Sequence, residues 1–194
     1  TIALIASDGC TLGGVNVTRG DPVVYRIVSD EELLSLLDGR EINLRRRFEA
    51  TLRDIVQVQK DLAFHKIVAR RIETAGNEAS PEDRIGLTTC ATRSGNTLRR
   101  QTNELKSILV VFDGIIQQLI NNAVPPAQLS ETMRQKIVVP LQEVVETDLP
   151  KADRSVSRFR VAASSRQPCD ALVTESEREV GQTIMRLKQS LEDV

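Results

Sequence analysis

The chain has 194 residues, 40% of them hydrophobic and 27% charged, which is an ordinary balance for a globular protein. Its 26 basic and 27 acidic residues nearly cancel, and no run of like charge is longer than the Arg45-Arg46-Arg47 triplet, so nothing indicates a nucleic-acid partner. No segment approaches the roughly 20 apolar residues of a membrane span, and we expect no membrane contact by this chain itself.

The first 28 residues have the character of short β-strands. An apolar run, TIALIA, precedes the turn residues Ser7-Asp8-Gly9, and a second β-rich run occupies residues 23–28 after the glycine-rich stretch GGVNVTRGDP. Two or three such strands are not stable alone. We therefore expect residues 1–28 to be the end of a preceding β domain. The strand-like opening and the helical ending QSLEDV indicate a fragment excised from a larger protein.

A long helix is predicted over about residues 40–75. Ser29 and Glu32 form a capping box in front of a short leucine-rich helix, which Asp38-Gly39 is expected to bend or end. From there, residues at alternating steps of four and three define a heptad seam typical of coiled coils. The seam consists of Leu44, Phe48, Thr51, Ile55, Val58, Leu62, His65, Ala69 and Ile72.

A second long helix is predicted over about residues 80–122. Ser80 and Pro81 supply its start, and Pro125-Pro126 follow its end. Its seam runs through Leu87, Ala91, Ser94, Leu98, Gln101, Leu105, Ile108, Phe112, Ile115 and Leu119. The short connection between the two seams requires an antiparallel hairpin, in which His65 would face Ala91 with Cys90 alongside.

Shorter helices are predicted over about residues 130–163 and 169–194, with Pro140 kinking the first or marking a break and Leu149-Pro150 starting a further segment. Aromatic residues are few, four Phe and one Tyr with no Trp, which favours an aliphatic helical core. The expected fold is mainly α: an elongated antiparallel helical hairpin or bundle over residues 29–194, with a short N-terminal β segment over residues 1–28.

No residue pattern points to catalysis, a cofactor or a metal. Cys10, Cys90 and Cys169 are far apart, there is no CxxC, and His65 is the single histidine. His65 beside Cys90 could form an imidazole–thiol pair that activates a nucleophile. A packing histidine and a buried cysteine are the simpler interpretation. Thr51, Ser94 and Gln101 interrupt the apolar seams, and polar residues there commonly specify register or partner choice.

The junction VVYRIVSDEELLSLLDGREINLRRRFEATLRDIVQVQKDL resembles large membrane-anchored bacterial proteins in which an immunoglobulin-like β region runs directly into long helices. The similar features are the strand ending at Ser29, the acidic start at Glu31–Leu34, and the segment Arg40–Glu49. The resemblance covers about a fifth of the chain and carries over no catalytic residue. It implies an extracytoplasmic helical stalk or scaffold in the bacterial envelope.

The leading functional hypothesis is a non-enzymatic scaffold, spacer or protein-interaction module. Its partner would be another copy of the chain, the parent domains or a partner helix. The alternative is a sensory or signalling helical domain, which a buried polar cavity around Thr51, Ser94 and Gln101 would favour. A thiol enzyme using Cys90 and His65 is the third hypothesis.

Overall fold

The computed structural model describes residues 5–7, 17–22, 29–76, 80–123 and 128–192. The chain divides into two units, Thr1–Leu36 and Leu37–Val194. In the first unit, β1 (Ile5–Ser7) pairs antiparallel with β2 (Val17–Arg19), with Ala6 opposite Thr18. Strand β2 lies inside the stretch predicted to connect two strands, where Val17 and Thr18 favour extended backbone. The second predicted strand, at residues 23–28, lies outside the described residues.

Helix α1 spans Asp30–Ala75 without interruption, so the end that was one of the two alternatives predicted at Asp38-Gly39 does not occur. A glycine inside a helix costs only about 1 kcal/mol, and the buried Leu37 and Leu44 on either side outweigh that cost. The Oγ atom of Ser29 accepts a hydrogen bond from the Glu32 backbone N–H at 3.2 Å, as expected of a capping residue.

Helix α2 spans Pro81–Asn121 and begins after the capping residue Ser80, whose Oγ accepts from the Glu82 N–H at 3.2 Å. Of the predicted seam residues on α1 and α2, all are buried except His65, which is half-buried. The heptad pattern therefore identified the inward faces of both helices correctly.

A third helical rod runs without a break from Gln128 to Ser164, as α3 (Gln128–Met133), η2 (Arg134–Val138), α4 (Val139–Glu143), η3 (Val144–Asp148) and α5 (Leu149–Ser164). Segments η2 and η3 are π-helical turns. The predicted break and new start at the prolines do not occur.

The two π-helical turns explain how prolines are accommodated inside the rod. A proline has no N–H, and its ring clashes with the carbonyl four residues earlier in an α-helix. Directly before Pro140, the Val139 N–H donates to the Arg134 carbonyl, and directly before Pro150, the Leu149 N–H donates to the Val144 carbonyl. Both bonds reach back five residues instead of four, which widens the helix just before each ring.

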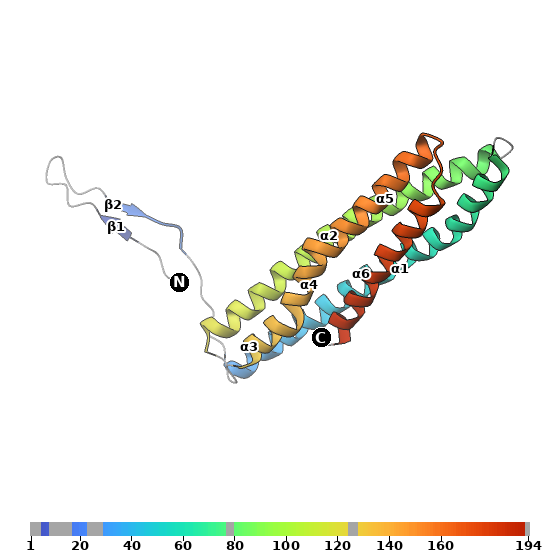
Figure 1. The fold of residues 1–194 in the computed structure, drawn as a ribbon. Helices are drawn as coiled ribbons and strands as arrows, with labels where there is room; N and C mark the ends of the chain where they lie inside the picture. Colours follow the sequence, from blue (N-terminus) through green and yellow to red (C-terminus); the bar gives the residue numbers. More distant parts are fainter. Residues whose placement is uncertain (1–4, 8–16, 23–28, 77–79, 124–127, 193–194) are drawn as a thin grey trace. The chain divides into compact units, whose positions relative to one another are not determined.

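Helix α6 (Asp170–Glu192) completes a four-membered bundle with α1, α2 and the third rod (Figure 1). Ion pairs join neighbours around the bundle: Arg47 to Glu104 for α1 and α2, Arg99 to Asp153 for α2 and α5, Arg158 to Glu175 for α5 and α6, and Lys66 to Glu177 for α6 and α1. Each neighbouring pair is antiparallel. The mainly-α bundle predicted from the sequence is confirmed.

The centre of the bundle is aliphatic with three phenylalanines. Phe48 and Phe112 are 1% exposed and Phe159 is fully buried. The fourth phenylalanine, Phe64, is 63% exposed on α1.

At the far end of α1, the Glu73 carboxylate accepts hydrogen bonds from the backbone N–H groups of Cys169 and Asp170, at 2.7 and 2.8 Å, and so caps the start of α6.

Candidate functional site

Two of the three polar seam residues meet at one pocket between α1 and α2. Thr51 and Gln101, 2% and 5% exposed, line a pocket of about 500 Å³. The Gln101 Nε2 atom donates to Asp54 Oδ2 at 2.6 Å, and Arg100 approaches the same oxygen at 3.0 Å. One carboxylate of α1 thus receives two donors from α2.

The charges at the other side of this pocket are also paired. Arg47 of α1 donates to Glu104 at 2.7 Å and to the Ser107 hydroxyl at 3.0 Å, both on α2. Because the donors on one helix match acceptors on the other, sliding the helices would separate several pairs together. Gln101 belongs to this set of pairs, whereas Thr51 only lines the pocket, and the role of the two residues in specifying register stays a prediction.

Ser94 lies away from that pocket and next to Cys90. Their Oγ and Sγ atoms are 3.9 Å apart inside the core. Burial raises the pKa of the Cys90 thiol to about 11, although the Ser94 contact opposes the shift. At neutral pH this thiol is protonated, which is the opposite of what a nucleophile requires.

The described contacts of the His65 ring are with residues other than Cys90. Its Nδ1 atom lies 2.8 Å from the Asp61 carbonyl one turn back, and its Nε2 atom faces Gly86, where a Cβ atom would lie 3.9 Å away. The pairing of His65 with Ala91 stays a prediction. In the described part of the chain, no hydrogen bond links the imidazole to the thiol. His65 packs at the edge of the α1–α2 seam, and its ring meets the Phe64 ring edge-on at 5.2 Å.

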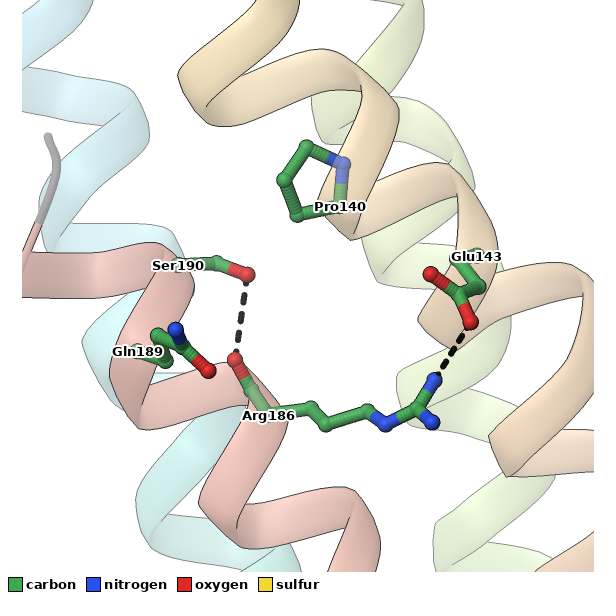
Figure 2. Close-up of a pocket in the computed structure, with 5 residues that line it drawn as sticks. All are labelled: Pro140, Glu143, Arg186, Gln189 and Ser190. Carbon is green, nitrogen blue, oxygen red and sulfur yellow. Dashed lines mark hydrogen bonds and ion pairs between the residues drawn. The ribbon is translucent and has the colours of Figure 1, made fainter.

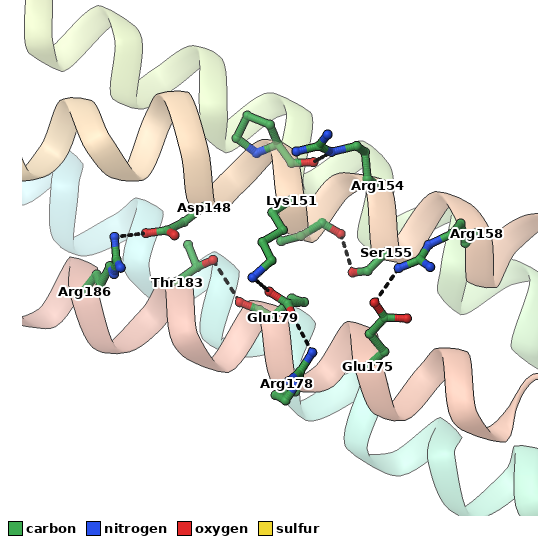
Figure 3. Close-up of polar contacts among 12 residues, drawn as sticks. Asp148, Lys151, Arg154, Ser155, Arg158, Glu175, Arg178, Glu179, Thr183 and Arg186 are labelled. Atoms are coloured by element: carbon green, nitrogen blue, oxygen red, sulfur yellow. Dashed lines mark hydrogen bonds and ion pairs between the residues drawn. The ribbon is translucent and has the colours of Figure 1, made fainter.

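A set of polar residues lies between α5 and α6 (Figure 3), and the structure buries Glu179, a carboxylate that a helical pattern alone would place on the surface. Glu179 is 4% exposed, and its carboxylate is held by Lys151 of α5 at 3.0 Å and by Arg178 at 2.7 Å. Ser155 is also buried and donates to the Ala152 carbonyl at 2.8 Å. The buried carboxylate is paired on both sides, which is the condition for retaining a charge in an interior.

Helix α6 also carries hydroxyl residues at one repeating position of its inward face. Ser176, Thr183 and Ser190 are at most 2% exposed, and each donates to the carbonyl four residues earlier in α6 itself. The seven-residue spacing is the signal that could have found them, because it continues the heptad to the buried Cys169. Their hydrogen bonds are satisfied within α6, so they act as small core residues.

A second, smaller pocket of about 290 Å³ lies beside the first π-helical turn, between α4 and α6 (Figure 2). Arg186 crosses it to reach Glu143 at 2.6 Å, and it approaches Asp148 at 3.2 Å. Burial raises the pKa of Asp148, with Arg186 opposing that shift. These two carboxylates raise the pKa of Arg186 further. Arg186 thus links α6 to the third rod near the rod's π-helical turns.

The described residues hold no group of three or more His, Cys, Asp or Glu side chains arranged to bind a metal ion. None of the helices, over their described residues, has the length and apolarity to cross a bilayer.

Comparison of the chain with protein-family models, with curated proteins and with solved structures finds no match in any of the three.

Proposed function

We propose that this chain is a non-enzymatic helical module that serves as a scaffold or spacer and supports protein contacts. The observation that carries the proposal is the closure of the core. The seams of α1 and α2 are covered by the third rod and α6, so the large apolar side chains of these seams are buried inside one bundle. Such a bundle is held together by its own packing and needs no ligand to fold.

The surface of α1 offers one place for contacts. Phe64 and Ile67 are 63% and 64% exposed and lie three residues apart, hence on one face of the helix. Exposed apolar residues are normal when scattered singly. An exposed aromatic side chain next to an exposed aliphatic one is typical of residues that become buried in a protein–protein interface. Self-association through this pair is the form of contact that can be tested first.

The experiment combines light scattering over a concentration series with hydrogen exchange. A constant monomer mass, together with slow exchange in all four members of the bundle, supports a self-contained spacer. A defined dimer that disappears in the Phe64→Ser, Ile67→Ser double variant supports an interaction scaffold. Fast exchange along a whole helix would contradict the proposal, because that helix would then lack its packing partner.

The resemblance of residues 23–62 extends the proposal to a helical stalk of the bacterial envelope. Fractionation of cells that make this protein tests this location, and recovery with cytosolic proteins would contradict it.

The second candidate is a sensory domain, and the pocket beside Thr51 and Gln101 favours it. Arg47 and Arg100 line that pocket together with Asp54 and Glu104, a mixed-charge lining that suits a zwitterion. Thermal unfolding in the presence of individual free amino acids tests this function. A rise in the unfolding temperature that is lost in Gln101→Leu supports it, and no rise at millimolar concentrations counts against it.

A further inference from the structure

A third pocket lies at the end of the bundle where α2 begins and α5 ends. Its volume is about 630 Å³. Its lining comes from the first turns of α2 and from the last turn of α5 and the residues just after it. The lining residues are Pro81, Arg84, Ile85, Thr88, Thr89, Ala163, Ser164 and Arg166.

The charge of this lining sets the pocket apart. In the pockets beside Thr51 and beside Arg186, arginines are paired with carboxylates that also line the pocket. Here the described lining residues include two arginines and no carboxylate. The acidic residues in the first turn of α2 are engaged elsewhere: Asp83 pairs with Arg71 of α1 at 3.7 Å, and Glu82 accepts a hydrogen bond from Ser80.

Arg166, which lines the pocket, has an unusual backbone conformation. Its φ of 55° is left-handed, a region that glycine usually occupies. The Gln167 N–H donates to the Ala162 carbonyl at 2.9 Å, and the Arg166 N–H donates to the Ala163 carbonyl at 3.4 Å. This is the Schellman arrangement, in which Arg166 takes the position that most helices give to glycine. No carboxylate among the described residues pairs with its guanidinium.

The remaining donors are directed by local bonds. Arg84 donates one N–H to the Gly76 carbonyl at 2.7 Å, which positions a guanidinium that has further N–H groups to offer. Thr88 and Ser164 donate their hydroxyl protons to helix carbonyls. The hydroxyl of Thr89 has no such bond in the described structure. Pro81, Ala163 and Ile85, which is 66% exposed, supply an apolar wall.

From this arrangement we infer that the pocket binds a small organic oxyanion, a carboxylate or a phosphate attached to an apolar body. Arg166 and Arg84 contact the anion, Thr89 donates to it, and Ile85 packs against its apolar part. The guanidinium group, with its planar set of donors, is the side-chain group best shaped for such oxygens. The inference is independent of the scaffold function, since a support module can carry a ligand site.

Calorimetric titration of the full chain tests the inference, with phenyl phosphate and benzoate as probes and benzyl alcohol as the neutral control. We expect phenyl phosphate, benzoate or both to bind, more weakly as salt is raised, and benzyl alcohol not to bind. Either anion meets the prediction, and the stronger one identifies the group that the site prefers.

Variants decide whether the site is the one described. Arg166→Gly removes the guanidinium and suits the left-handed backbone, so the protein stays folded, and affinity falls at least about tenfold. Arg166→Lys keeps a cation and retains most of the affinity. Arg46→Gln, which removes an exposed arginine of α1, leaves binding unchanged. The inference is overturned if no anion binds at millimolar concentration, if Arg166→Gly binds as the parent does, or if Arg46→Gln loses as much.

Discussion

The first and second halves of the bundle solve the same packing problem with different side chains. The seams of α1 and α2 are filled mainly by large apolar residues such as Phe48 and Phe112, and their ion pairs, such as Arg47 with Glu104, are partly exposed. Helix α6 instead brings hydroxyls and a buried carboxylate into its interface with the third rod, and that rod carries two prolines and two π-helical turns. Seams made mainly of large apolar residues are therefore one way to build such a bundle, and small side chains bonded within their own helix are another.

The largest expected effect tests the first half. Phe112→Ala should lower the free energy of unfolding by about 3–5 kcal/mol, because it removes a fully buried ring and leaves a cavity. Urea unfolding followed by circular dichroism measures the change. Phe64→Ala is the matched control, with the same atoms removed from a site that is 63% exposed, and it should change stability by less than about 0.5 kcal/mol. Equal effects at the two sites would contradict the buried position of Phe112.

Thr183 tests the second half in the opposite direction. Thr183→Leu should destabilise the protein by about 1–3 kcal/mol, because a larger side chain does not fit where α6 packs through small residues. The free energy of unfolding of Thr183→Val, measured in the same urea series, should lie within about 1 kcal/mol of that of the unsubstituted protein. The hydroxyl that this variant loses is bonded only to its own helix. If Leu is tolerated as well as Val, the close packing assigned to this position is wrong.

Phe112 and Thr183 also show which buried residues can be predicted from the sequence and which cannot. The three- and four-residue steps through Phe48 and Phe112 are strong because large apolar side chains mark the inward face directly. Thr183 and its neighbours at the same heptad position carry hydroxyls, so a hydrophobic pattern passes over them, although their spacing is regular. The hydrogen bond of each to its own helix is what makes them core residues, and that bond depends on side-chain rotamer.

The prolines and the candidate site were harder to predict for related reasons. A proline within a helical pattern is compatible with a break, a kink or a π-helical turn, and the packing of neighbouring helices decides among them. At the seam, Thr51 and Gln101 were identified from their polarity, but Asp54 and Arg100 were not, because they lie at flanking positions whose partners depend on the exact register.

Glu73 joins the two halves, and its loss should have an intermediate effect. Glu73→Ala should destabilise the protein by about 0.5–2 kcal/mol, the usual range for losing a helix cap, because the Cys169 and Asp170 N–H groups lose their acceptor. Hydrogen exchange should show faster opening confined to the first turn of α6. Glu49→Ala is the control, since the partner of Glu49 is Arg45, four residues away on the same exposed surface. Equal exchange in both variants would show that Glu73 does not cap α6.

The smallest effect compares how the two halves end their helices. Gly76 after α1 and Arg166 after α5 both have left-handed backbones, with φ of 57° and 55°. Arg166→Gly should stabilise the protein by about 0.5–1 kcal/mol, because a side chain in this region clashes with the following carbonyl. Gly76→Ala should destabilise it by a similar amount for the same reason, although open space surrounds the glycine. If the two variants change the free energy of unfolding in opposite directions in one urea series, the arginine at position 166 lowers stability compared with a glycine there. A destabilising arginine is expected at this position if its guanidinium binds a ligand. If both variants change the free energy of unfolding in the same direction, the backbone conformation gives no reason to single out Arg166.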